Sequence, residues 1–316
     1  MATTLTINST YAGESAGKII APALLMSPTL DRGGVEIMPN VKKSATIQKI
    51  DTSAIIADGS CDFTATGTVA LTERTLSPKE LQVNVQICKT SFVQTWEAIE
   101  LGYSAFNEVP ASFRDFFLAR MAEEVASANE VSFWNGATGT SGQYDGIMTQ
   151  IAVDAALPPA QEVAGTVVTA ENVVGELGKI VDALPPRLYG LPDLHIYVSQ
   201  NIYKLYKRAL GGFGAAGLGA NGYRGEGNNQ QLGDVMFDGI PLFVAEGLTA
   251  DQAICTQKSN LYFATGLMND YNEVALIDLS PIDGSQNIRF VMRFTAAANY
   301  GYAEEIVTYG VTNAAN

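Results

Sequence analysis

The sequence predicts an α+β fold, and three observations support this class. Apolar residues recur every fourth position between residues 111 and 135, which predicts one long amphipathic helix. From residue 169 onward, helical and strand patterns alternate, and the last third has the period-two alternation of strands. The 316 residues, 47% of them hydrophobic, suffice for about two domains with a sizeable core.

The composition excludes several functional classes. Charged residues make up only 16% of the chain and the net charge is −14, which argues against phosphate binding by clustered Lys and Arg. Residues 121–316 carry most of this negative charge. The first residues lack the basic region of a signal peptide, so we expect a cytosolic protein. Its three cysteines are far apart, which predicts neither a zinc site nor a disulfide.

The first fifty residues are interrupted by Gly and Pro too often for a long helix, so residues 1–50 are predicted to form an extended arm. Residues 51–92 are predicted to form a long β-hairpin. Val83, Val85 and Ile87 alternate with polar residues in one strand, and residues 68–71 offer the partner strand. The hairpin's tip is expected to hold Arg74, Ser77, Pro78 and Lys79.

Residues 93–166 are grouped with the long helix, predicted over 111–135. Pro110 precedes its first turn, where a missing N–H costs nothing. Phe117, Met121 and Val125 lie on its apolar stripe. Gly136 is predicted to end the helix in a left-handed conformation at the C′ position.

Residues 167–264 are predicted to form an α/β domain. Thr169 is expected to cap a helix that ends before Pro185, and Ser199 is expected to cap a second helix after a strand at 194–198. The glycine-rich stretch from Gly211 to Gly233 is predicted to be a long loop, of a length that is usually either functional or disordered. Residues 265–316 are predicted to be closing strands. Turns at Asp238-Gly239 and Asp283-Gly284 indicate two hairpins.

Motifs for catalysis are sparse. The single histidine, His195, is expected to be a packed strand residue. Gly13-Glu14-Ser15-Ala16-Gly17 matches a nucleophile elbow, so a serine hydrolase using Ser15 and His195 is a remote alternative. Two G-x-G-x-x-G strings between residues 212 and 222 lack the strand that delivers a dinucleotide. We therefore predict a protein that is not an enzyme, with no cofactor and no metal.

One stretch carries a family resemblance. The long helix ends in Trp134-Asn135-Gly136, and after a loop of small residues the chain returns as Gln143-Tyr144-Asp145-Gly146-Ile147-Met148. This resembles the end of the spine helix in major capsid proteins of tailed double-stranded DNA phages. The predicted order of elements is similar to the Hong Kong 97-type fold over nearly the whole chain. The strings at 71–79, 82–88 and 142–146 are similar to capsid proteins of the crAss-like phages.

The resemblance implies a structural virion protein that assembles as hexamers and pentamers into an icosahedral shell around phage DNA. It implies an extended loop at about 52–88, a spine helix at 111–135, an axial domain at about 167–264, and a return to the peripheral domain from Phe290 to Tyr309. Implied partners are other copies, portal, scaffolding and decoration proteins, with no membrane and no sequence-specific DNA binding. Assembly is expected in the bacterial cytoplasm. An encapsulin-type compartment is the main alternative. The expected subunit-contact residues are Arg74, Pro78, Lys79, Gly212, Gly214, Gly219, Arg289 and Arg293.

Overall fold

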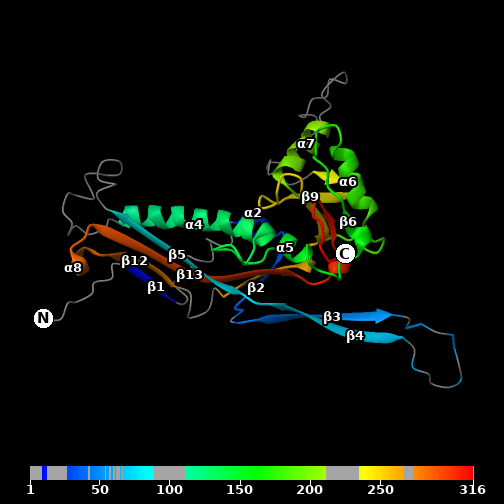
Figure 1. Cartoon of the computed structure of the whole chain (residues 1–316), viewed down its shortest axis with the longest axis horizontal. Helices are drawn as coiled ribbons and strands as arrows, with labels where there is room; N and C mark the ends of the chain where they lie inside the picture. The colour runs from blue at the N-terminus through cyan, green and yellow to red at the C-terminus, as the bar shows by residue number, and fades with distance from the viewer. Residues whose placement is uncertain are drawn as a thin grey trace.

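The long helix α4 (Ala111–Asn135) lies along one six-stranded sheet, and a second six-stranded sheet stands near the helix's C-terminal end (Figure 1). A two-stranded ribbon projects beyond both. The computed structural model describes residues 9–12, 27–41, 43–53, 55–56, 58–59, 61, 65, 67–88, 111–210, 235–266 and 273–315. The helix matches the predicted range of 111–135. Pro110 lies outside the described residues.

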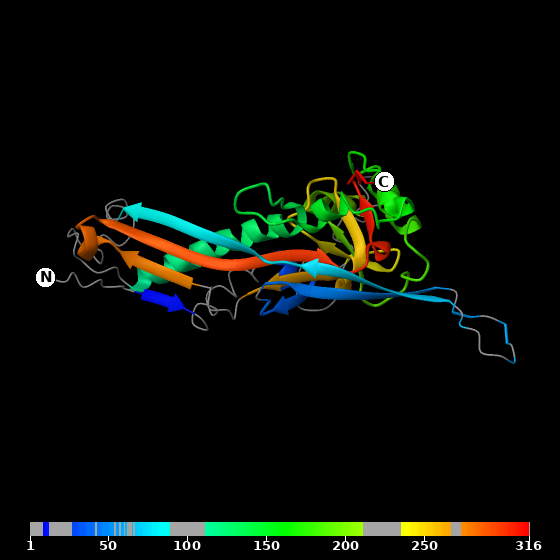
Figure 2. The same ribbon diagram turned by 60° about the horizontal axis from the view of Figure 1, so that its bottom comes forward.

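The first sheet is organised around one long strand. Its strands, in spatial order, are β1 (Ser9–Ala12), β12 (Glu273–Asp278), β13 (Asn287–Tyr300), β11 (Leu261–Thr265) and β2 (Glu36–Pro39), with β5 (Lys79–Cys88) also paired to β13. Figure 2 shows β13 running the length of this sheet beneath α4. Ile288, Phe290 and Met292 are buried while Arg289 and Arg293 are exposed, which confirms the predicted one-sided strand.

The core under α4 comes from the predicted apolar stripe. Phe117 and Val125 are buried, and Phe117 meets Phe290 of β13 edge to face with ring centroids 5.7 Å apart. At the end of the helix Phe133 and Trp134 are fully buried. A short helix, α5 (Ile147–Ile151), packs into the same core.

Gly136 ends the helix for a different reason than predicted. Its φ is not among the positive values, so the left-handed C′ prediction is wrong. A Cβ atom at Gly136 would overlap the carbonyl oxygens of Tyr144 and Ser132. The backbone N–H of Gly146 donates to the Gly136 carbonyl at 2.9 Å. Gly136 is therefore required because the returning chain passes directly against it.

The second sheet builds the predicted α/β region. Its strands, in spatial order, are β6 (Glu162–Val163), β14 (Val307–Tyr309), β10 (Ala253–Gln257), β7 (Leu194–Val198), β9 (Ile240–Val244) and β8 (Met236–Phe237). Helices α6 (Val173–Asp182) and α7 (Gln200–Leu210) pack into its core. Ser199 caps α7 as predicted, since its Oγ accepts from the Ile202 N–H at 3.3 Å. Thr169 does not cap α6, because the helix begins later, after Asn172.

Both predicted turns lie between antiparallel strands. Asp238 and Gly239 have φ values of 46° and 80°, the left-handed pair of a tight hairpin between β8 and β9. β12 and β13 also pair, but one helical turn, α8 (Ser280–Asp283), separates them. The remaining short helices are α2 (Pro28–Asp31), η2 (Pro159–Gln161), η3 (Lys258–Asn260) and η4 (Ala303–Glu305).

The predicted hairpin of residues 51–92 is wrong in its pairing. β4 (Thr68–Leu76) pairs with β3 (Ala45–Ser53), which comes from the predicted arm, and β5 pairs with β13 instead. The ribbon is therefore β3 with β4, and Arg74 and Lys79 lie at its base rather than its tip. The apolar alternation of β5 is satisfied by β13 and the core under α4.

The predicted domain boundaries place two strands in the wrong sheet. β11 falls within the predicted axial range but pairs with β13 of the first sheet. β14 falls within the predicted return to the peripheral domain but pairs with β10 of the second sheet. The chain thus crosses between the sheets after Tyr300, through η4.

Candidate functional site at the base of the ribbon

The ribbon has two different faces. Directly opposed residues of an antiparallel pair lie on the same face, and the faces alternate along each strand. Ile47 opposes Arg74 and Lys49 opposes Thr72, so Lys49 and Arg74 share one face. Ile50 opposes Leu71 and Thr52 opposes Val69 on the other. We call the first the base face and the second the open face.

The base face is fastened to the body of the molecule. Leu76 is 1% exposed and forms a small core with Val41, Ala264 and Ala297. The Asn299 side chain of β13 donates to the Thr75 carbonyl at 3.0 Å. A two-stranded ribbon is only marginally stable alone, so these contacts stabilise it where it joins the body.

The open face carries apolar side chains into solvent. Ile50 is 63% exposed, Val69 72% and Leu71 58%, and they lie on adjacent positions of the two strands. Exposed aliphatic residues gathered on one face of a projecting ribbon are typical of a surface that another chain covers.

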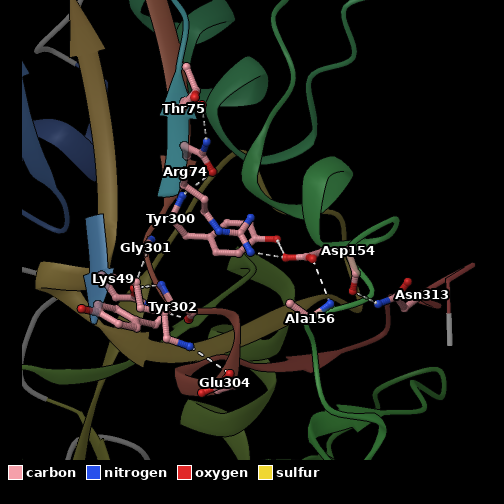
Figure 3. A network of polar contacts seen from close by, with 12 residues as sticks. Lys49, Arg74, Thr75, Asp154, Ala156, Tyr300, Gly301, Tyr302, Glu304 and Asn313 are labelled. Atoms are coloured by element: carbon pink, nitrogen blue, oxygen red, sulfur yellow. Dashed lines mark hydrogen bonds and ion pairs between the residues drawn. The ribbon is translucent and has the colours of Figure 1, made fainter. Parts of the chain in front are cut away.

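Arg74 is held between a tyrosine ring and a carboxylate (Figure 3). Its guanidinium carbon lies 4.2 Å from the centroid of the Tyr300 ring, and its Nη2 forms an ion pair with Asp154 Oδ2. The Tyr300 hydroxyl donates to the same oxygen at 2.6 Å. The Ala156 N–H donates to Asp154 Oδ1 at 2.9 Å.

These contacts determine the protonation states of Asp154 and Tyr300. Burial acts to raise the pKa of Asp154, but hydrogen bonds from Tyr300 and Ala156 and the charge of Arg74 outweigh it, so the pKa is lowered. Burial, together with the Asp154 carboxylate, raises the pKa of Tyr300. At neutral pH the site therefore holds a carboxylate, a neutral phenol and a guanidinium. The arrangement supports electrostatic fastening rather than proton transfer.

Lys49 repeats the arrangement on the other strand. Its Nζ lies 2.9 Å from Glu304 Oε1 and 5.3 Å from the centroid of the Tyr302 ring. Glu304, in η4, is also approached by Arg187 at 3.9 Å, and Arg187 lies 3.7 Å from Glu305. Glu304 and Glu305 therefore belong to an ion-pair network within the chain.

A groove of about 450 Å³ lies where β4 passes into β5, with Pro78 and Lys79 on its lining. Lys79 Nζ donates to the carbonyl oxygens of Thr138 at 3.1 Å and Gln143 at 2.6 Å. Lys79 therefore ties the ribbon base to the loop that follows α4.

The other predicted contact residues lie elsewhere. Arg289 and Arg293 are exposed on β13, and Arg289 Nε donates to Gln86 of β5 at 2.9 Å. Gly212, Gly214 and Gly219, with the whole stretch from Gly211 to Gly233, lie outside the described residues. Arg74 thus contacts Asp154 and Tyr300, whereas Pro78 and Lys79 line the groove where β4 passes into β5.

The hydrolase alternative is not assembled from the described residues. His195 is half-buried in β7, where its Nδ1 lies 2.9 Å from the Asp193 carbonyl and its ring packs edge to face on Phe243. This is the packed strand residue predicted. Ser15 lies outside the described residues.

Within the described ranges, no group of three or more His, Cys, Asp or Glu side chains could hold a metal ion. Among the helices of the same part of the chain, none is both long and apolar enough to cross a membrane. In that part, no disulfide joins Cys61, Cys88 or Cys255.

Sequence reasoning missed five residues of the site: Lys49, Asp154, Tyr300, Tyr302 and Glu304. Each follows or lies in an element whose local sequence pattern is explained without any contact to a distant residue. Arg74 and Asp154 are 80 residues apart, and Tyr300 and Asp154 are 146 apart. The only local signal was the pair of tyrosines at alternate positions, Tyr300 and Tyr302, beside the acidic Glu304.

The fold is shared with known structures. The chain is similar to a chain of the satellite phage P4 procapsid that includes the size determination (Sid) protein, with TM-score 0.56 and 12% identity, covering 93% of this chain and 99% of that one. It is similar to the capsid of a native GTA particle, with TM-score 0.57 and 13% identity, covering 92% and 90%. It is also similar to a chain of Mycobacterium phage Adephagia, with TM-score 0.57 and 14% identity, covering 90% and 89%.

No protein-family model matches the sequence, and no curated protein matches it either. The structural similarity covers 90–93% of this chain and 89–99% of these three chains. This confirms the predicted α+β fold of Hong Kong 97 type.

Proposed function

We propose, from this shared capsid fold, that the protein is the major capsid protein of a tailed double-stranded DNA phage. The observation that carries the proposal is the extent of the similarity: two phage chains and a GTA capsid chain match over almost their full lengths, not over one common subdomain. The narrower relation to the crAss-like phages stays a prediction.

The ribbon supports assembly as the function. Ile50, Val69 and Leu71 are exposed on its open face, although they are of the residue types that proteins usually bury. If a second copy of the chain covered them, the assembly would be stabilised by about 25 cal/mol per Å² of apolar surface removed from water. The free energy of the shell then comes from surfaces that a single copy leaves uncovered.

The proposed assembly is a set of closed rings. Like other homo-oligomers with cyclic symmetry, copies would meet through the same two surfaces around each ring, giving hexamers and pentamers of an icosahedral shell. Partners in the proposal are portal, scaffolding and decoration proteins. The shell would enclose DNA without reading its sequence, in agreement with a net charge of −14. We place assembly in the host cytoplasm and the product in the virion.

Electron microscopy of particles purified from phage-infected cells, combined with nuclease treatment, tests the proposal. Icosahedral shells formed in phage-infected cells and holding nuclease-resistant DNA are expected. Shells that contain a packaged enzyme and no DNA would favour the encapsulin alternative instead. A protein that stays monomeric at high concentration and reacts with a fluorophosphonate at Ser15 would sink the capsid proposal and revive the hydrolase.

A further inference from the structure

Each strand of the ribbon carries one cation toward the body, and the two cations sit in matching surroundings. Arg74 on β4 meets a tyrosine ring and an aspartate, and Lys49 on β3 meets a tyrosine ring and a glutamate. The two rings, Tyr300 and Tyr302, are alternate residues where the chain leaves β13. We call these six residues the clamp: Lys49, Arg74, Asp154, Tyr300, Tyr302 and Glu304.

The Arg74 half of the clamp is enclosed. The Arg74 side chain is 26% exposed and that of Asp154 is 17%. Asp154 is itself fixed from three sides, by Tyr300, by the Ala156 N–H, and through its carbonyl by the Asn313 side chain at 2.8 Å. A carboxylate held this firmly offers one position for the guanidinium.

The Lys49 half is more open and is shared. Lys49 is only 15% exposed, but Glu304 is 41% exposed. Its carboxylate also faces Arg187, which follows α6 of the second sheet. Glu304 thus connects the ribbon with the second sheet. Salt screens its ion pairs more readily than the enclosed pair of Arg74 and Asp154.

We propose that Lys49 and Arg74 are positioning residues, which fix the direction in which the ribbon leaves the body before another copy of the chain covers its open face. The inference rests on the proposed capsid function for its purpose, but its geometry is independent of it. Lys49 on β3 and Arg74 on β4 attach the same face of the ribbon to the body at two points. Attachment on both strands opposes bending of the ribbon away from the body and rotation about its own axis. A ribbon already aligned loses less conformational freedom on association, so subunits join faster.

The test measures ribbon direction in the free chain. Exposed Cys61 lies beyond β3, toward the far end of the ribbon, and exposed Ser141 lies in the loop after α4. Spin labels on Cys61 and on Ser141→Cys, in a Cys88→Ser background, report their separation by double electron–electron resonance; Cys255 is buried and stays unlabelled. One narrow distance is expected for the parent. A broad distribution of distances is expected in the double methionine variant, which combines Lys49→Met with Arg74→Met. The same broadening is expected in Asp154→Asn.

Two control variants distinguish a loss of the clamp from a general effect on folding. Arg74→Lys keeps the charge and is expected to retain most of the narrow distance. Arg120→Met removes an ion pair of similar length, 2.7 Å to Glu123, on the exposed side of α4, and is expected to leave the distance unchanged. A double methionine variant that keeps the narrow parent distance would overturn the proposal.

The association rate, followed by light scattering, links the clamp to assembly. The double methionine variant is expected to associate more slowly than the parent. Arg74→Lys is expected to associate at nearly the parent's rate. An unchanged rate together with a broadened distance would overturn the assembly role of the clamp. If the parent protein forms no shells at all, the capsid proposal fails, whereas the distance measurement still decides whether Lys49 and Arg74 position the ribbon.

Discussion

The Glu130 carboxylate, inside α4, accepts a hydrogen bond from the backbone N–H of Thr29 at 3.1 Å, across 101 residues of sequence. Three more donors point at the same buried carboxylate: the hydroxyls of Ser27 and Thr29 and the Trp134 indole N–H. Glu130 is only 2% exposed. One acidic side chain thus anchors the segment that leads into β2 on the end of the long helix.

Glu130→Gln should destabilise the protein strongly although it changes a single atom. The amide nitrogen cannot accept, so some of the four buried donors lose their partner, at about 1–3 kcal/mol each. Urea unfolding followed by circular dichroism measures the loss. Glu123→Gln, on the exposed side of the same helix, is the control and should cost under ~1 kcal/mol. Equal stability of the two variants would contradict the anchoring role.

The clamp predicts an acid dependence at Asp154. Because the folded-state pKa of Asp154 lies below its ordinary value of about 3.9, its charged form stabilises the fold above that pH, and the contribution is lost as the pH falls through the folded-state pKa. Asp154→Asn should therefore be less stable than the parent by about 1.5–3 kcal/mol at neutral pH. The difference should shrink below about pH 4.

Denaturant unfolding at a series of pH values tests this. Asp58→Asn, at an exposed residue beyond β3, should match the parent at neutral pH. A stability difference between Asp154→Asn and the parent that stays constant down to the lowest pH would show that the carboxylate's charge does not matter to the ribbon base.

The close approach at Gly136 predicts a position-specific cost. Gly136→Ala introduces a methyl group against two backbone carbonyls, and backbone cannot move aside as a flexible side chain can. Overpacking of this kind costs about 1–3 kcal/mol. Gly139→Ala, three residues later, meets nothing within 4 Å and should be neutral. Thermal unfolding compares them; equal midpoints would refute the steric explanation.

The open face of the ribbon should matter for association and not for folding. Ile50→Thr, Val69→Thr and Leu71→Thr together keep β-branched or strand-compatible residues while removing apolar surface. Surface changes of this type alter stability by about 0.5 kcal/mol or less each. Sedimentation should show folded chains with far fewer shells. Val131→Thr, 44% exposed on α4, is the matched control, and normal shell yield in the triple variant would exclude this face from assembly.

Local patterns predicted the parts of the fold that are locally determined. The i+4 stripe through Phe117 and Val125 located α4, and Asp238-Gly239 located a turn, because helix periodicity and positive φ are encoded within a few residues. The alternation at Val83 and Val85 showed that β5 is a strand. It could not show the partner, since β13 and β4 both offer a complementary edge and the true partner is about 200 residues away.

The site was harder to predict than the fold. Arg74, Pro78 and Lys79 were singled out for the tip of a hairpin, and the structure places them at the ribbon's base because β4 pairs with β3. Asp154 and Glu304 become meaningful only once Tyr300 and Tyr302 are placed beside them. The contact roles of Arg289, Arg293 and the glycines of 211–233 stay predictions.

The pairing of β5 with β13 also governs how the chain is made. Cys88 finds its partner Asn287 only after about 200 further residues have left the ribosome, which takes about 10–40 s at 5–20 residues per second. During that interval β5 is complete but its ladder partner does not exist. Nascent chains on neighbouring ribosomes therefore present the same unpaired strand edge to one another, the template for aggregation, and lower synthesis temperature or a bound holdase should raise the yield of soluble protein.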